Sequence, residues 1–455
     1  MQPNNAFLGT ERISRLLFRL AIPAVTAQIV NMLYNMVDRI YIGHIDVIGA
    51  DALTGLGVCN PLIIAISAFA ALVCMGASPT VSRFMGEGDN AKAEKVIGTS
   101  ATVLIIVALI LTVVMEIFCT PLLYAFGASD ITIKYAVEYL RIYAIGTIFV
   151  QITLGLNTFI TAQGFAKTGM FTVIIGAVLN IILDPIFIFV FDMGVSGAAL
   201  ATIISQFVSA SWVVIFLCGK KSILKLRLSN MKPDFKILAR SMALGISPFI
   251  MQITESVLFL SFNSSLLKYG GDTAVGAMTI LTSVMQFCML PLTGFTQGAS
   301  PILGYNLGAG NPQRLKDTFS LLLKVCLIYA TILWLLIMLF PNTIAEIFTS
   351  DASLRDYAAW AMRIYMAGTF MFGAQISCQM AFVSLGNAKY SIFLAVLRKI
   401  ILLIPLIFIL PHIFTADKCM AVFLAEPVSD ILAAITTSTL FYIQFKKVLK
   451  SLSDK

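Results

Sequence analysis

Two polar side chains, Asn180 and Asp184, interrupt a long apolar stretch of this chain, and together they could bind a proton or a hard cation. They are four residues apart, so they lie on one face of a helix. A carboxylate inside a membrane costs at least about 2.5 kcal/mol, so it needs either a structural partner or a function. Pro185 follows at once, and because proline has no N–H, a neighbouring carbonyl is also left free. This stretch predicts an ion or proton site within a hydrophobic helix.

A second polar group lies near the N-terminus, where Gln28, Asn31, Asn35 and Asp38 are spaced by three, four and three residues. This spacing forms one polar stripe along an otherwise apolar helix. The three amides could simply hold this helix to its neighbours by hydrogen bonds, or they could belong to a site with Asp38. The charge of Asp38 is costly for a purely structural role. Pro23 precedes the stripe and predicts a hinge in the helix.

The elements that must position these residues are membrane helices. The chain has 455 residues, of which 59% are hydrophobic and only 12% are charged. A soluble domain of this size could not bury so much apolar surface. Apolar runs of about 20 residues, each long enough to cross a hydrocarbon core about 30 Å thick, recur twelve times. We therefore predict an all-α integral membrane protein with twelve transmembrane helices.

The chain is also a duplication. The Gly-Ala-Ser-Pro motif at 76–79 recurs at 298–301, and Arg-Ile-Tyr at 141–143 recurs at 363–365, so one offset of 222 residues serves both. Each half has an even number of spans, so the two copies point the same way, as a parallel repeat. We expect a six-helix N-terminal lobe (1–218), a linker (219–235) and a six-helix C-terminal lobe (236–455).

The distribution of positive charge sets the expected orientation. Most of the 31 Lys and Arg residues lie in the N-terminus, the even-to-odd loops and the C-terminal tail, whereas only four, Lys134, Lys268, Arg355 and Lys418, lie in the opposite loops. By the positive-inside rule, both termini and the basic linker are cytoplasmic. The net charge of +8 needs no nucleic-acid partner to explain it. The eight cysteines are scattered singly and form no CxxC pair, so they indicate no metal site.

With this topology, the polar residues of the first half meet at one depth. The helices of Asp38 and of Asn180 and Asp184 run outward, and Thr202 lies about two turns into the next helix, which runs inward. At 1.5 Å per residue all four residues fall roughly 10 Å inside the outer surface. Two carboxylates there cannot both stay charged unless a cation lies between them. We predict one binding site for H+ or Na+, with no other metal and no cofactor.

The second half is not equivalent to the first. Gln252 and Glu255 repeat the start of the polar stripe, but Phe259 and Phe262 then take the places of Asn35 and Asp38. Glu255 could recognise a cationic substrate or relay a proton, or it could be held by neutral glutamines. Methionine and aromatic side chains nearby suit flat apolar ligands. The residues predicted for a substrate cavity are Glu255, Gln252, Gln286, Met289, Gln375 and Gln379.

These features together resemble the MATE (multidrug and toxin extrusion) transporters over essentially the whole chain. The Asp of the first helix and the Asn/Asp pair of the fifth are similar to the DinF-like and MepA-like bacterial branch of that family. The resemblance implies that positions 38, 180, 184 and 202 form a cation site in the N-terminal lobe, and that organic cations leave through a V-shaped cavity. One departure is that the turn after Tyr365 offers Thr369, where NorM-like relatives have an acidic residue.

The predicted function is therefore cation-coupled antiport of organic, often cationic, drugs and toxins across the cytoplasmic membrane, and not an enzymatic reaction. We expect a monomer whose partners are small organic cations and membrane lipid. The sequence has no nucleotide-binding motif, so active transport must use an ion gradient. The alternative is a flippase for lipid-linked saccharide precursors, which requires a strongly cationic cavity. A passive channel is disfavoured, because a pore needs no pair of buried carboxylates.

Overall fold

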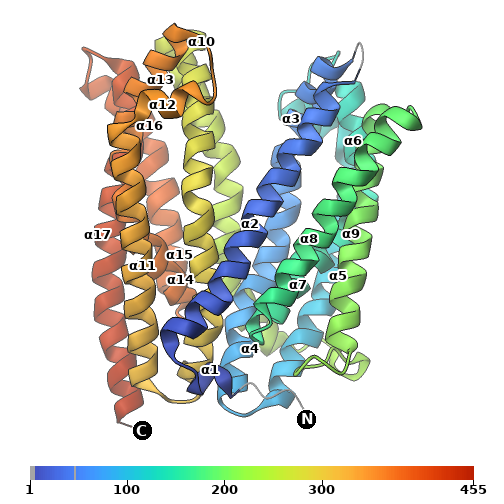
Figure 1. The fold of residues 1–455 in the computed structure, drawn as a ribbon, viewed down its shortest axis with the longest axis vertical. Helices are drawn as coiled ribbons and strands as arrows, with labels where there is room; N and C mark the ends of the chain where they lie inside the picture. The colour runs from blue at the N-terminus through green and yellow to red at the C-terminus, as the bar shows by residue number, and fades with distance from the viewer. Residues whose placement is uncertain (1–5, 46–47, 455) are drawn as a thin grey trace.

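The computed structural model describes residues 6–45 and 48–454, and within these ranges all regular structure is helical (Figure 1). The first half forms the N-terminal bundle. Its helices are α1 (Phe7–Thr10), α2 (Ile13–Gly43), α3 (Gly49–Ala70), the π-helical segment η1 (Ala71–Met75), α4 (Gly76–Gly86), α5 (Asn90–Ala125), α6 (Ile133–Ile145), α7 (Thr147–Ala162), α8 (Ala166–Pro185), the π-helical segment η2 (Ile186–Val190) and α9 (Gly194–Cys218).

The second half forms the C-terminal bundle, after a short 3-10 turn, η3 (Leu228–Asn230), in the connection. Its elements are α10 (Phe235–Gly308), α11 (Pro312–Leu339), α12 (Pro341–Glu346), α13 (Ala352–Tyr365), the 3-10 turn η4 (Thr369–Met371), α14 (Phe372–Ser384), α15 (Ala388–Val396), the π-helical segment η5 (Leu397–Leu403), α16 (Ile404–Ile413) and α17 (Lys418–Ser453). The two bundles stand side by side, with both chain ends at the same end of the molecule (Figure 1).

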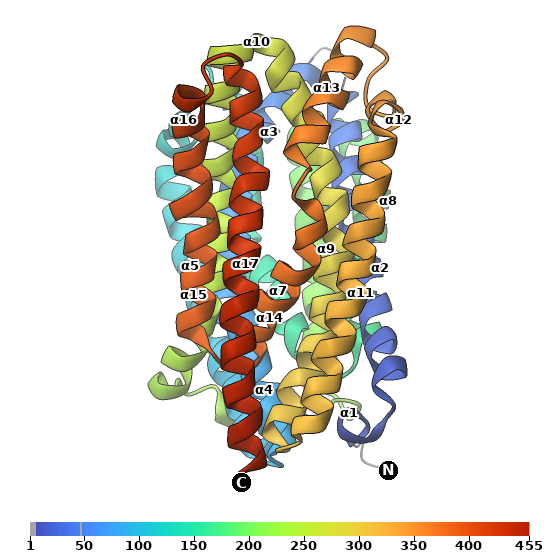
Figure 2. The same cartoon turned by 90° about the vertical axis from the view of Figure 1, so that its left-hand side faces the viewer.

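Length and hydropathy identify membrane spans directly. Among the described residues nine helical segments can cross a membrane, or ten if α6 and α7, bent by 58° between them, form one span. One of these segments, α10, has 74 residues and reverses at Gly271, where φ is +63° (Figure 2). At 1.5 Å per residue it would be about 110 Å long if straight, so it is two spans. The exposed apolar faces, such as Ile110 and Ile117 of α5, suit contact with lipid.

Matching turns start the third helix of each repeat. Gly88 and Gly310 adopt φ values of +78° and +65°, which glycine reaches without the strain that a side chain would cause. Immediately after them, Asp89 accepts a hydrogen bond from the amide of Lys92 (2.9 Å) and Asn311 from that of Arg314 (3.0 Å). These caps satisfy amides that α5 and α11 would otherwise leave without acceptors.

Small residues bring the two bundles together near the end that carries the termini. A Cβ on Gly76 would overlap the carbonyl oxygen of Ser241, and one on Gly245 would overlap that of Leu72. The second Gly-Ala-Ser-Pro copy does the same against α2, where Gly298 lies against Ala21. Close backbone approach through small residues is the usual means of helix association in membranes. The duplicated motif is thus an interface between the bundles.

Towards the other end the bundles separate. The apolar core formed by residues such as Leu56, Tyr139 and Val195 belongs to the N-terminal bundle alone, and the core around Phe262 and Phe423 belongs to the C-terminal bundle alone. In contrast, a core near the termini combines Leu16 and other residues of α2 with residues of α10 and α11. The bundles therefore share packing at one end and part at the other, as Figure 1 shows.

The connection between the bundles is fastened to the N-terminal bundle. Glu94 of α5 forms an ion pair with Arg227 (3.2 Å) and accepts a hydrogen bond from the amide of Lys225 (3.0 Å). Lys95 donates to the carbonyl of Lys232 (2.7 Å), and Thr102 donates to that of Met231 (2.5 Å). The linker is thus held in place along α5 by side-chain contacts that its basic composition did not reveal.

Candidate functional site

The polar residues predicted from the first half lie in three helices of the N-terminal bundle. Asn180 and Asp184 lie on one face of α8, as their spacing requires, and the Asn180 amide donates to Asp184 Oδ1 (3.0 Å). The same amide lies 3.3 Å from Thr202 Oγ1 on α9. Asp38 comes from α2, which packs along α8, and its charge acts on Asp184. All four side chains are buried.

The oxygens of this cluster are only partly satisfied. Among the described residues, Asp38 Oδ1, Asn180 Oδ1 and Asp184 Oδ2 are buried and have no hydrogen-bond donor. Buried acceptors without a donor are rare in native proteins and usually mark a missing partner. Here three such oxygens come from two carboxylates and an amide, which are ligands suited to a proton or a hard cation. The arrangement can therefore take up one positive charge.

Two tyrosines that were not predicted from the sequence also interact with this cluster. The Asp38 carboxylate acts electrostatically on the hydroxyls of Tyr34 and Tyr139. Tyr34 lies one helical turn before Asp38, so the spacing rule that joined Asn180 to Asp184 could have found it. Tyr139 comes from α6 and is buried against Tyr143, with the ring centroids 6.1 Å apart. Its position depends on tertiary packing, which the sequence did not show.

The rest of the polar stripe divides between two environments. Gln28 crosses to the C-terminal bundle, where its amide donates to Gln297 Oε1 (3.3 Å). Asn31 and Asn35 are exposed, and Asn35 donates back to the carbonyl of Asn31 (2.6 Å). Pro23 is buried within α2, which stays helical on both sides of it. Gln28 thus fits the structural interpretation of the amides, and the hinge at Pro23 stays a prediction.

Glu255 is not held by neutral glutamines. It forms an ion pair with Lys399 of η5, which also donates to the carbonyl of Met251 (3.2 Å). The next residue, Arg398, binds Asp430 (2.7 Å) and Glu426 (3.3 Å) of α17. The alternative in which Glu255 pairs with Gln286, Gln375 or Gln379 is therefore wrong. Its partner Lys399 lies with Arg398 between strongly apolar neighbours, where no local pattern points to Glu255.

The predicted cavity residues also divide. Gln375 and Gln379 are buried, and the Gln379 amide donates to Ser247 Oγ and to the carbonyl of Ser391 (3.0 Å each). Gln379 thus holds α10 and α15 together, and a place for these two side chains in a substrate cavity stays a prediction. The remaining four are at least partly exposed, namely Gln252, Glu255, Gln286 and Met289.

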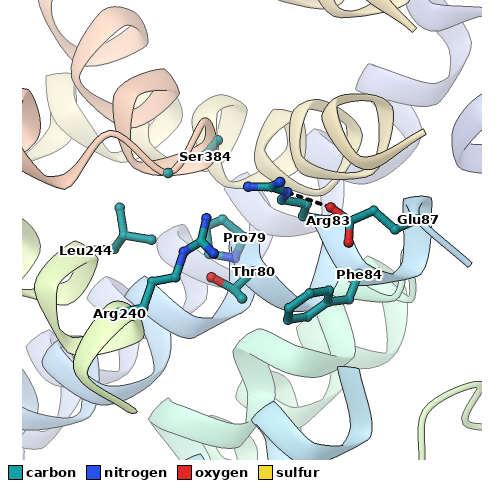
Figure 3. A pocket seen from close by; sticks show the side chains of 9 residues that line it. Pro79, Thr80, Arg83, Phe84, Glu87, Arg240, Leu244 and Ser384 are labelled. Atoms are coloured by element: carbon teal, nitrogen blue, oxygen red, sulfur yellow. Dashed lines mark hydrogen bonds and ion pairs between the residues drawn. The ribbon is translucent and has the colours of Figure 1, made fainter. Parts of the chain in front are cut away.

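A cavity of about 250 Å³ lies at the closed end of the molecule, between the two bundles (Figure 3). Arg83 of α4 and Arg240 of α10 bring two guanidinium groups to it, and Arg83 donates to Glu87 (2.8 Å). It sits beside the glycine contacts described above, so it belongs to the seam between the bundles. The remaining lining residues are Pro79, Thr80, Phe84, Leu244, Ser384 and Gly386.

An all-helical, multi-pass membrane protein with paired bundles and a buried cluster of carboxylates has the architecture of a membrane transporter. The MatE family model matches residues 23–186 and 248–409, one segment in each half. These segments cover more than half of the chain, so the chain belongs to the MATE family of transporters and is not an enzyme. The resemblance inferred from the sequence is confirmed.

Curated relatives match most of the chain, and solved structures with the same fold match nearly all of it. The chain is 24% identical to "Multidrug export protein MepA" of Staphylococcus haemolyticus over 92% of each chain, and 24% identical to that of Staphylococcus aureus strain N315 over 88% of each. A crystal structure of MATE in the bent conformation matches with a TM-score of 0.92, at 23% identity, over 100% of both chains. An outward-facing MATE multidrug transporter matches with a TM-score of 0.91, at 23% identity, over 98% of this chain and 99% of that one.

Proposed function

We propose that this chain exports organic, often cationic, drugs and toxins across the cytoplasmic membrane in exchange for H+ or Na+, by alternating access. The observation that carries the coupling is the set of three donor-free oxygens on Asp38, Asn180 and Asp184. The names of the MepA relatives support multidrug export. The two bundles share a core only near the termini, which supports a conformation that is open at the opposite end. That end faces outward if the termini are cytoplasmic.

In the proposed cycle, the coupling cation enters the N-terminal bundle from the outward-open side. Its charge relieves the repulsion between Asp38 and Asp184 and gives the free oxygens a partner. α2 then bends near Pro23, the space between the bundles shrinks, and the substrate leaves outward. A tenfold concentration gradient of the coupling cation supplies about 1.4 kcal/mol. The membrane potential adds about 2.3 kcal/mol per 100 mV for a neutral substrate, whereas for a monocation exchanged one for one the two charge movements cancel. The inward-open state releases the cation and accepts the next substrate.

Whole-cell efflux tests this function. Cells that lack other exporters and express the chain should extrude tetraphenylphosphonium or ethidium against a gradient. A protonophore at fixed sodium, or removal of sodium at fixed pH, then shows which cation drives export. Equal retention of dye with and without the chain, at matched expression in the membrane, would contradict the proposal.

The topology makes a separate prediction. Ser229→Cys, in the exposed part of the linker, should react with an impermeant thiol reagent only from the cytoplasmic side. Asp272→Cys, near the reversal of α10 at the opposite end, is the matched control and should react only from outside (Figure 2). Both belong in a Cys218→Ser background, because Cys218 is the exposed cysteine in the described part of the chain. Reversed labelling of the pair would overturn the orientation.

Glu255→Gln should weaken export of cationic drugs more than export of neutral ones. The Glu255 side chain is 61% exposed, so a cationic substrate can approach its carboxylate. It lies six residues beyond the Phe69–Phe249 ring contact between the bundles, or about 9 Å along α10. Comparing efflux of tetraphenylphosphonium with that of a neutral dye checks this. A uniform loss for every substrate would instead place Glu255 in the ion pathway.

The flippase alternative finds less support. A flippase for phosphate-bearing lipids needs free cationic groups, but Arg398 and Lys399 are both neutralised by ion pairs with carboxylates. The cluster around them carries more negative than positive groups. Its charge therefore favours cationic over anionic ligands.

A further inference from the structure

The ionic cluster of the C-terminal bundle contains one negative charge too many. It joins two bases, Arg398 and Lys399, to three carboxylates, Glu255, Glu426 and Asp430. Among these only the Glu255 side chain is exposed, whereas Arg398, Lys399, Glu426 and Asp430 are all buried at 8% exposure or less. Because the Lys399 ammonium binds the exposed Glu255, the two buried carboxylates share the single charge of Arg398. A buried charge without compensation is strongly unfavourable, so this buried group of Arg398, Glu426 and Asp430 is one positive charge short.

The geometry shows where that charge is missing. Arg398 Nε donates to Asp430 Oδ1 (2.8 Å), and its terminal nitrogen reaches Glu426 (3.3 Å). Asp430 Oδ2 is buried and, within the part of the chain that the structure describes, has no hydrogen-bond partner. Asp430 is only 1% exposed. An acceptor so placed indicates a proton on this carboxyl pair.

Lys399 connects this buried pair to the exposed glutamate. It belongs to η5, a π-helical segment, and such segments often occur at functional sites. Its ammonium binds Glu255, and it follows Arg398, which binds Glu426 and Asp430. Two consecutive residues of η5 thus connect the carboxylate that a substrate can reach to the pair that it cannot. The buried hydroxyl of Tyr365 of α13 also interacts electrostatically with all three carboxylates.

We propose that this cluster is an exchange site, in which the missing positive charge is supplied either by a proton shared between Glu426 and Asp430 or by an organic monocation at Glu255. With the proton bound, Lys399 stays on Glu255 and competes with the substrate. When the carboxyl releases the proton to water, the new negative charge draws Lys399 inward and frees Glu255. This rests on the proposed function and adds a second, separate coupling site in the C-terminal bundle.

The test measures proton release on ligand binding. Purified chain in lipid nanodiscs, in lightly buffered solution with a pH indicator, is mixed with tetraphenylphosphonium. The wild type should release about one proton per cation bound, whereas Asp430→Asn and Glu426→Gln should bind the cation without release. Asp272→Asn, an exposed carboxylate of the same bundle, is the matched control and should release as the wild type does. Lys399→Gln should bind the cation about tenfold more tightly, because Glu255 loses its competitor.

Three outcomes would overturn the exchange site. The first is undiminished proton release in both Asp430→Asn and Glu426→Gln. The second is release that depends on Asp184 and not on Asp430, which would leave the N-terminal coupling site standing. The third is a wild type that binds no tetraphenylphosphonium, which would also overturn the proposed substrate class. Two independent carboxyl variants keep the test valid if one of them does not fold.

Discussion

Asp38→Asn and Asp184→Asn are each expected to abolish gradient-driven export while leaving the chain folded. An amide keeps the shape of the side chain and the Asn180–Asp184 hydrogen bond, but it cannot take up the charge of the coupling cation. Without that charge, export of a neutral dye loses about 2.3 kcal/mol per 100 mV, which corresponds to roughly fifty-fold less accumulation. Export of a monocation, for which the voltage term cancels, loses about tenfold per tenfold gradient of the coupling cation. Dye efflux from cells, with membrane expression and melting temperature measured alongside, checks this expectation.

Asp51→Asn serves as the matched control, because Asp51 is an exposed carboxylate at the start of α3 in the same bundle. It should export as the wild type does. If Asp38→Asn or Asp184→Asn pumped at near wild-type rates with intact gradient dependence, the cluster would be structural. The coupling would then have to reside in the C-terminal bundle.

Gly245→Val should have a comparably large effect by a different route. A Cβ at this position would overlap the carbonyl oxygen of Leu72, so the two bundles could not close as they do here. Overpacking of this kind costs about 1–3 kcal/mol, and about 1.4 kcal/mol already shifts a conformational equilibrium tenfold. The variant should therefore shift the population towards a conformation that is open at the end with the chain termini, and it should lose export.

A buried reporter beside this contact measures the shift. Thr80 lies in the seam cavity, between α4 and α10, and is only 9% exposed. In a Cys218→Ser background, Thr80→Cys should react with a thiol reagent about tenfold faster when Gly245→Val is present. Gly57→Ala is the control, because a Cβ there meets no atom within 4 Å. Unchanged labelling in a folded Gly245→Val protein would show that this seam does not control access.

The sequence predicted the N-terminal cluster because its signal is local. Asn180 and Asp184 are one turn apart, and the positive-inside rule then brought Asp38 and Thr202 to the same depth. The all-helical membrane fold followed from the apolar runs, and the structure and family comparisons confirm it. Tyr139 was not predicted, because it lies on α6 and only the packing of that helix brings it near Asp38.

The C-terminal cluster was missed although a comparable signal was present. Glu426 and Asp430 are also four residues apart in an apolar helix, as Asn180 and Asp184 are. Arg398 and Lys399 stand between apolar residues, and nothing local shows that the first turns to α17 and the second to α10. Arg398 and Lys399 point to different helices from within a π-helical segment, where the angular spacing of side chains differs from that of an α-helix.

The role of the duplicated small-residue motif also needed the structure. Its recurrence at 76–79 and 298–301 established the repeat, but repetition does not say what a motif touches. The three-dimensional arrangement shows both copies at the interface between bundles, where Gly76 lies against α10 and Gly298 against α2. The same residues that mark the duplication therefore form the contact that the proposed alternating access would have to open.

The central claim is that the Asp38–Asp184 cluster converts an ion gradient into export, and transport by purified protein in liposomes tests it most directly. Uptake of tetraphenylphosphonium is followed with a proton gradient, a sodium gradient or neither, for the wild type and for Asp184→Asn. The wild type is expected to accumulate the compound above equilibrium under one gradient, whereas Asp184→Asn should only let it equilibrate. Accumulation by Asp184→Asn with the same gradient dependence as the wild type would contradict it.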